Sequence, residues 1–476
     1  MDREESSRIP RAYLAGGSMV DDPIKHVVVL ALENRSFDHA LGACQAVKKE
    51  IDGVPPGAPP RLNICDGKPF PQVAGADRIM IDDPRHETSH VLRQLKPDSG
   101  GSPNSGFVQD YSDAYPMLDD DGRAEVMKFH ALDALPALHT LAKNFAVCDR
   151  WFSSVPGPTW ANRLFLMSGT SLGRVNMPNG VLDLNLHWYD QPTIFDRLNE
   201  RSRSWAVYHG DTPLSFLLVH QWEPMNVARH KPMTQFFHDV TNTEHFPDFV
   251  FIEPAYLEPG ANDDHPSHDV LAGEALIASV YNALRINEDL WNSTLLVVLF
   301  DEDGGFYDHV TPPAAVPPDH HQEEYTFDRL GVRVPALLVS PWFDNGVLHE
   351  VYDHTSLLRY LIDKWQLGPL GDRAANAKTF ASALLPTRRT DTIRVIPSTP
   401  ATLTPATVPP RKPLNDHQSA LIALSHALES MAGEDPAVIA ARSRQVITGP
   451  QSQIDAAVER IDAFVSHAAG MVAKHL

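Results

Sequence analysis

Five short apolar runs alternate along the chain with longer segments of helical periodicity. The runs lie at residues 24–32, 205–209, 249–253, 294–300 and 334–339. They lack the polar alternation of a half-exposed strand, so we predict buried parallel strands. The segments with helical spacing lie at residues 135–144, 162–168, 269–284 and 356–365. This alternation predicts an α/β fold, a three-layer sandwich with a mostly parallel central sheet.

Two proline-rich stretches, residues 54–71 and 98–117, interrupt the alternation and are predicted to be long loops. Residues 386–413 are rich in Thr, Pro and Arg, which predicts a linker or an extended arm that wraps the domain. Beyond it we predict helices at residues 416–431, 436–446 and 451–475. The expected organisation is a main domain over residues 1–385, the arm, and a helical appendage over residues 414–476. These helices are expected to pack on the domain or on a partner chain, which would form an oligomer.

The charge of the chain excludes some partners. Asp and Glu number 61 against 40 Lys and Arg, a net charge of −21. Such a chain is a poor partner for nucleic acid or for an anionic membrane as a whole, although transient contact with a membrane surface is compatible with it. The three cysteines do not make a disulfide framework, and we expect three buried thiols.

The first 20 residues carry acids and arginines and no apolar signal-peptide core, and no run of 18 apolar residues follows. The sequence predicts a soluble protein. As written it is cytoplasmic, or it is secreted by a leaderless route or from a leader outside this sequence.

Pairs of metal-binding side chains follow two of the predicted strands. Glu33 and Asn34 come after the run at residues 24–32, and Asp301 and Glu302 come after the run at residues 294–300. Ligands of open α/β sheets bind beyond the carboxyl ends of the strands. A single acid there commonly caps a helix or pairs with an arginine, but two adjacent pairs favour a divalent cation. Oxygen-rich ligation suits Ca²⁺, Mg²⁺ or Mn²⁺.

Thr159 lies in the segment SSVPGPTWANR, where a rigid Pro-Gly-Pro turn precedes a predicted helix. Threonine is a good N-cap residue, and that role needs no chemistry. The amino end of a helix also favours a phosphate and an alkoxide, and a metal would lower the pKa of the hydroxyl enough to make it a nucleophile. The local sequence leaves both interpretations open. The role of His309, which follows Gly304 and Gly305, is open in the same way. It is a candidate general acid, phosphate donor or supporting residue of the site, and the alternative is a structural histidine.

Five segments occur in an order that resembles a known family. They are HVVVLALENRSFDHALG, LPALHTLAKNFAVCDRWFSSVPGPTWANR, FIEPAY, NDDHPSHD and DEDGGFYDHVTPP. Together they resemble the phosphoesterase family, which contains bacterial phospholipases C, plant non-specific phospholipases C and a bacterial acid phosphatase. The match runs from about residue 24 to 365, about three-quarters of the chain, and leaves the last hundred residues unmatched.

The resemblance implies an alkaline phosphatase-like fold and makes residues 1–385 a phosphoesterase catalytic domain. It implies Thr159 as nucleophile and histidines that contact phosphate or transfer protons. It implies one or more divalent metal ions, with Zn²⁺ added to the ions above. The implied metal ligands are Glu33, Asn34, Thr159, Asp301 and Glu302, and the implied histidines are His86, His265, His309 and His209.

The chain departs from the family pattern at two places. Asp303 stands where the family more often has His, and His268-Asp269 stand where it often has Asn-Gly.

The resemblance also implies a function. A threonine nucleophile goes with the phospholipase C members of the family, so we expect cleavage of a phospholipid phosphodiester through a phosphothreonine intermediate. The alternatives are an acid phosphatase and a non-catalytic phospholipid-binding module. Five aromatic residues are candidates for a headgroup cage through cation–π contacts, or for the core. They are Trp151, Trp160, Trp188, Tyr189 and Trp205.

Overall fold

The computed structural model describes residues 22–95, 103–177, 189–257, 260–398, 414–431 and 450–473. Its centre is an eight-stranded sheet in the order β13-β6-β12-β11-β1-β10-β8-β9. In chain order the strands are β1 (His26–Leu32), β6 (Ala146–Cys148), β8 (Trp205–His209), β9 (His230–Pro232), β10 (Phe249–Glu253), β11 (Thr294–Phe300), β12 (Ala336–Val339) and β13 (Val347–Leu348). All five predicted strands are present, and their side chains are almost entirely buried because helices cover both faces of the sheet.

The direction of one strand, β12, differs from the prediction. Strands β1, β8, β10 and β11 are parallel, but β12 pairs antiparallel with β11 and with β6. The expectation of a parallel strand at residues 334–339 was therefore wrong. A parallel neighbour needs a crossover, usually a helix, to return the chain to the opposite edge. Residues 301–335 contain no helix, so the chain re-enters the sheet at the edge where β11 ends.

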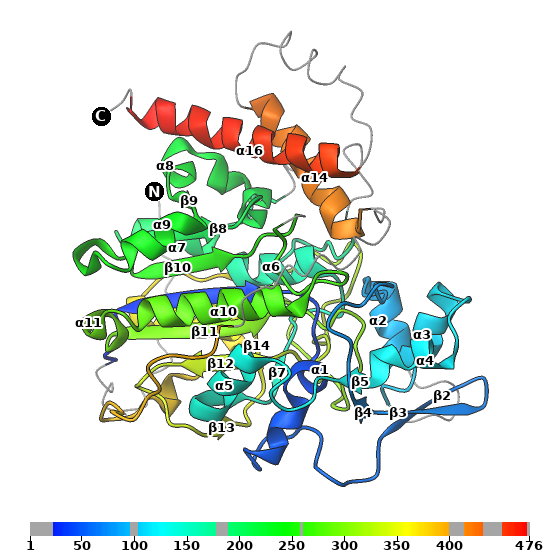
Figure 1. Cartoon of the computed structure of the whole chain (residues 1–476). Coiled ribbons are helices and arrows are strands. Elements are labelled where there is room, and N and C mark those ends of the chain that lie inside the picture. The colour runs from blue at the N-terminus through cyan, green and yellow to red at the C-terminus, as the bar shows by residue number, and fades with distance from the viewer. Residues whose placement is uncertain are drawn as a thin grey trace, which may run out of the picture.

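Helices complete the three layers. The four predicted helices are present as α5 (Pro136–Asn144), α6 (Thr159–Ser168), α10 (Val270–Leu284) and α12 (His354–Trp365). Figure 1 shows α5 and α10 across the front of the sheet, and α6 and α12 pack against each other. One continuous apolar core joins the strands to helices on both sides. The prediction of a three-layer α/β sandwich is confirmed.

Shorter elements connect these layers. The helices are α1 (Phe37–Leu41), α2 (Thr88–Leu95), α3 (Phe107–Ala114), α4 (Asp120–Arg123), α7 (Ile194–Glu200), α8 (Pro224–Val227), α9 (Met233–Asp239), α11 (Glu288–Trp291) and α13 (Gly371–Asn376). The strands are β2 (Leu62–Cys65), β3 (Lys68–Pro71), β4 (Val73–Ala74), β5 (Lys128–Phe129), β7 (Trp151–Phe152) and β14 (Tyr352–Asp353).

The two predicted loops contain regular structure, which corrects the prediction. Strands β2 and β3 form a hairpin within residues 54–71, closed by Asp66-Gly67 with both residues at positive φ. Asp-Gly is a strong signal for such a turn, and the prolines concealed it. Residues 98–102 lie outside the described part of the chain, and α3 occupies much of the remainder of the second predicted loop. Helices α2 and α3 pack into a small second core with Phe306.

The C-terminal part of the chain packs on the main domain. Residues 386–398 lie against the C-terminal end of α10. There Arg285 Nε donates to the backbone oxygen of Ile393 at 3.1 Å. Helices α14 (Asp416–Met431) and α16 (Pro450–Ala473) pack on each other, and their apolar faces join the main core. The Arg460 guanidinium of α16 binds Glu429 of α14 at 3.1 Å. The helix predicted at residues 436–446 lies outside the described residues, and the domain boundaries stay a prediction.

The structure also bears on the cysteines and on membrane-spanning helices. Cys44, Cys65 and Cys148 are buried free thiols, as predicted. Among the helices in the described ranges, none is long and apolar enough to cross a membrane.

Candidate active site

The two strand-end pairs meet at one edge of the sheet. The parallel register of β1 and β11 pairs Leu32 with Phe300, so the residues that follow both strands emerge side by side. The Asn34 backbone N–H donates to Asp301 Oδ1 at 3.3 Å, and the Glu302 N–H donates to the same oxygen at 2.7 Å. All four side chains of the two pairs are fully buried. The structure therefore brings together the four strand-end residues that the sequence singled out.

Arg163 supplies positive charge to this cluster, and the sequence analysis did not single it out. Its Nε donates to Asp301 Oδ2 at 3.0 Å, and its Nη2 approaches Glu33 Oε1 at 3.3 Å. The same Nη2 donates to the backbone oxygen of Leu32 at 3.2 Å. One buried guanidinium thus joins the ends of both strands. The available signal was its position four residues after Thr159, on the same face of a predicted helix.

Thr159 is the first residue of α6, and Pro158 is the N-cap. The Thr159 hydroxyl is fully buried and has no hydrogen-bond partner in the described part of the chain. It therefore does not cap the helix, which removes the alternative that needs no chemistry. Asn162 fixes the preceding loop, because its amide nitrogen donates to the backbone oxygen of Gly157 at 2.8 Å and its oxygen accepts from Val155 N–H at 3.1 Å.

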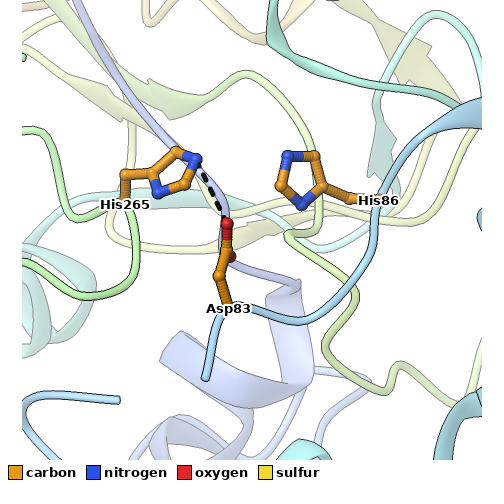
Figure 2. Close-up of side chains that lie close together, drawn as sticks. All are labelled: Asp83, His86 and His265. Atoms are coloured by element: carbon orange, nitrogen blue, oxygen red, sulfur yellow. Dashed lines mark ion pairs between the residues drawn. The ribbon is translucent and has the colours of Figure 1, made fainter. Parts of the chain in front are cut away.

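Two predicted histidines lie together beside the strand-end pairs. Figure 2 shows His86 and His265 with Asp83 between them. The rings of the two histidines are 5.6 Å apart, and His265 Nε2 lies 3.9 Å from Asp83 Oδ2. His86 Nδ1 contacts the backbone oxygen of Pro84 at 2.8 Å, which leaves Nε2 toward the strand ends. That nitrogen lies 3.4 Å from the amide nitrogen of Asn34 and 3.9 Å from Glu302 Oε1.

Burial and charge shape the ionisation of these groups. Burial raises the pKa of Asp301 to about 6 and that of Asp303 to about 7, and it raises the pKa of Glu302 well above its usual range. Burial opposes charge on His86, but the nearby carboxylate of Glu302 and other acids raise its pKa to about 10. Burial lowers the pKa of His265 well below its usual value. The cluster holds more buried carboxylates than its cations balance, and a divalent cation would reverse this shift toward protonation.

The donor set fits such a cation. Asn34 Oδ1, Thr159 Oγ1 and Glu302 Oε1 are buried oxygens without a hydrogen-bond partner among the described residues. Buried polar atoms are rarely left in this state, so these three oxygens favour a bound ligand. Asp301 and Glu33 share their oxygens with Arg163, and Asp301 also accepts the two backbone N–H groups. Asp83, His86 and His265 form a second group whose ligand atoms lie within 4.8 Å of one another.

His309 lies in a different environment from the one the sequence suggested. Its Nδ1 contacts Asp38 Oδ2 at 2.8 Å, and its Nε2 contacts Asp52 Oδ1 at 3.0 Å. Burial opposes charge on His309, but these two carboxylates raise its pKa to about 9. The buried Arg333 guanidinium binds Asp38 at 3.0 Å and Asp308 at 3.1 Å. Both ring nitrogens of His309 are thus engaged in a charge network with Asp38 and Asp52, which is separate from the hydrogen bonds of the strand-end pairs in the described structure. A cation site in this network is disfavoured because Arg333, His309 and the Asp38 N–H already donate to the carboxylate oxygens of Asp38 and Asp308.

The remaining candidates are His209 and the five aromatic residues. His209 ends β8, and its Nδ1 contacts the backbone oxygen of Asp211 at 2.6 Å. Burial lowers its pKa to about 4. Four of the five candidate cage residues are buried in the core, namely Trp151, Trp160, Tyr189 and Trp205. Trp188 lies outside the described residues. The core interpretation holds for these four.

Known proteins match this chain along most of its length. The model of the phosphoesterase family matches residues 24–368. Non-specific phospholipase C3 of Arabidopsis thaliana is 36% identical over 356 residues, covering 71% of this chain and 67% of the relative. Phospholipase C B of Mycobacterium tuberculosis is 28% identical over 414 residues, covering 74% of this chain and 75% of the relative.

One similar solved structure is a protein of the alkaline phosphatase superfamily from Vibrio parahaemolyticus, with 14% identity, a TM-score of 0.32, and coverage of 50% of this chain and 62% of that one.

Proposed function

The chain belongs to the phosphoesterase family and is a phospholipase C-like hydrolase, and from that premise we propose that it cleaves a phospholipid phosphodiester with Thr159 as nucleophile. The relatives' names support the substrate class, since both are phospholipases C. The products would be diacylglycerol and a phosphorylated headgroup.

The observation that carries the proposal is the buried, unpartnered hydroxyl of Thr159, which begins the helix whose Arg163 binds Asp301 and Glu33 at the strand ends. A hydroxyl in this state does not contribute a hydrogen bond to folding, so stability alone does not explain it. We propose that Glu33, Asn34, Thr159, Asp301 and Glu302 would hold the divalent metal. A bound cation would lower the pKa of the Thr159 hydroxyl and withdraw charge from the phosphate.

The proposed reaction has two steps. Thr159 Oγ1 attacks phosphorus, an O–P bond to threonine forms, and the bond from phosphorus to the diacylglycerol oxygen breaks. Water then attacks the phosphothreonine, the bond to Thr159 breaks, and the phosphorylated headgroup leaves. The free backbone N–H groups in the first turn of α6 would stabilise the charged oxygens in both steps.

The histidines take separate roles in this proposal. His86 directs Nε2 toward the strand ends and, when protonated, would donate to a phosphate oxygen. The His265 ring is held by the contact of Nδ1 with the backbone oxygen of Pro266, and Nε2 lies 3.9 Å from Asp83 Oδ2, which leaves Nε2 as the nitrogen for proton transfer. His265 would take the proton of the Thr159 hydroxyl and give it to the departing diacylglycerol oxygen. In the second step it would take a proton from the attacking water and return it to Thr159 Oγ1. His309, with both nitrogens bound to carboxylates, would support the fold instead.

A paired assay tests the ester class and the metal together. Purified protein is given p-nitrophenylphosphorylcholine, a diester, and p-nitrophenyl phosphate, a monoester, each with and without a chelator. We expect faster hydrolysis of the diester and loss of both activities on chelation, with recovery when a divalent metal is restored. Preference for the monoester would favour an acid phosphatase, and hydrolysis of neither would favour a non-catalytic binding module.

A further inference from the structure

The first turn of α14 contacts three residues at the edge of the candidate site. His417 Nδ1 lies 3.0 Å from Glu33 Oε2. Asn415 Nδ2 lies 3.3 Å from His265 Nδ1, and Gln418 Nε2 lies 3.2 Å from His268 Nε2. Figure 1 shows α14 crossing α16, with one end directed toward the body of the domain. A helix from the appendage therefore reaches residues that come from three separate segments of the main domain.

The turn is built into the domain. The side chain of His417 is almost fully buried, and its ring lies 4.9 Å from the ring of Tyr256. Gln418 Nε2 also donates to the backbone oxygen of Tyr256 at 3.3 Å. The Tyr256 ring in turn lies 5.7 Å from the guanidinium carbon of Arg163. His417 and Arg163 thus both pack against Tyr256, and the Arg163 guanidinium is the cation that joins the two strand ends.

Glu33 depends on this helix for one of its two oxygens. Arg163 approaches Oε1, and His417 contacts Oε2. An ionised carboxylate only accepts hydrogen bonds, so the hydrogen of this bond sits on His417 Nδ1. The other ring nitrogen, Nε2, is buried and has no partner in the described ranges. Without His417, a buried carboxylate oxygen would lose its donor, which is costly and lets the side chain rotate.

We propose that His417 is a positioning residue of the active site, which holds the Glu33 carboxylate in the orientation that the site requires. Pairs of this kind fix a ligand's geometry, and their loss typically weakens metal affinity or activity tenfold to a hundredfold. This inference rests on the proposed function for its kinetic consequence. It makes α14 a part of the active site and distinguishes the helix from a purely structural appendage.

The test uses the full chain and three variants. His417→Ala removes both ring nitrogens, while His417→Asn keeps an amide donor at the position of Nδ1. His426→Ala is the matched control, because it changes the same residue type about two and a half turns further along α14. Chelator-treated proteins are titrated calorimetrically with Ca²⁺, Mg²⁺, Mn²⁺ and Zn²⁺. Thermal unfolding and the kcat and KM for p-nitrophenylphosphorylcholine are measured alongside.

We expect His417→Ala to lose tenfold to a hundredfold in metal affinity and in kcat, with KM little changed. His417→Asn should recover most of both losses, and His426→Ala should match wild type. If His417→Ala fails to fold, His417→Asn still decides the question, because the proposal requires that an amide donor at the position of Nδ1 restores near-wild-type metal affinity.

Three outcomes would overturn the inference. His417→Ala could equal wild type in affinity and kcat, which would make the contact structural. His417→Asn could be as defective as His417→Ala, which would assign the effect to Nε2. A higher kcat in His417→Ala would show that the turn obstructs the site. If wild type hydrolyses no ester the proposed function fails, but the metal titrations still decide the role of His417. If wild type binds none of the four metals, the turnover comparison decides it.

Discussion

Arg163 lies one helical turn after Thr159 on α6, so a single helix presents the candidate nucleophile and the cation that joins the two strand ends. The Arg163 Nε donates to Asp301 at 3.0 Å. Residues four apart lie on the same face of a helix, which fixes the distance between the hydroxyl and the guanidinium. The position of the hydroxyl relative to the strand-end acids is therefore set by the ion pair as well as by the backbone.

Replacing Arg163 with Met should destabilise the metal-free protein by about 3–5 kcal/mol, because Glu33 and Asp301 would keep their burial and lose their cation. Urea unfolding measures the change. Arg359→Met is the matched control, since Arg359 pairs with Asp363 near the surface and should contribute less than about 1 kcal/mol. Equal stability of the two variants would show that the buried pair is not needed.

Replacing Thr159 with Val should abolish turnover and leave the metal-free fold as stable as wild type or more stable. Valine keeps the shape of threonine and removes a buried hydroxyl that has no partner in the described structure. We expect kcat to fall about a thousandfold or more, as for the removal of other nucleophiles. Thr159→Ser keeps the hydroxyl and should retain substantial activity. Measurable phosphodiesterase activity in Thr159→Val, close to that of wild type, would contradict the proposed mechanism.

Gly304 turns the chain directly after the strand-end acids, with φ at +62°. A Cβ there would overlap the backbone oxygen of Asn34. Gly304→Ala should therefore cost about 1–3 kcal/mol of stability and displace Asn34. Metal affinity should fall with it. Gly346→Ala is the control, because a Cβ at that position meets no atom within 4 Å. Unfolding curves and calorimetric metal titrations of the two variants test the prediction, which fails if Gly304→Ala binds metal as tightly as wild type.

The strands and their ends could be predicted because the information is local. A buried strand such as β11 is visible as seven consecutive apolar residues, and Asp301-Glu302 directly follow it. Neighbouring parallel strands then bring their ends together without further information. The direction of β12 was not visible in this way, because a run of apolar residues is the same in both directions. It depends on the absence of a crossover helix between residues 301 and 335.

The missed parts of the site depend on contacts between distant segments. His417 reaches Glu33 only because α14 folds back against Tyr256 and His268, and no local pattern reports that approach. The run Asn415–Gln418 offered a weak signal, since four hydrogen-bonding side chains open an otherwise apolar-faced helix. His309 shows the converse. Its motif suggested chemistry, but Asp38 and Asp52, both distant in sequence, engage its two nitrogens.

The His309 network predicts a dependence of stability on pH. The side chain is 14% exposed, and its two carboxylate partners raise its pKa from 6.5 to about 9. A raised folded-state pKa stabilises the fold fully below the unfolded value, and this contribution is lost as the pH rises from 6.5 through about 9. At about 1.4 kcal/mol per pKa unit, the shift corresponds to about 3 kcal/mol. Wild type should therefore lose about that much more stability than His309→Gln between pH 6 and pH 9.5.

Urea unfolding at several pH values across this window measures the difference between the two proteins. Asp52→Asn provides the internal control, because it removes one of the two carboxylates and leaves Asp38 in place. Its dependence on pH should fall between those of wild type and His309→Gln. Parallel stability curves for wild type and His309→Gln would mean that His309 carries no extra proton in the folded protein. The contacts with Asp38 and Asp52 would then be those of a neutral imidazole, which can donate from only one of its two nitrogens.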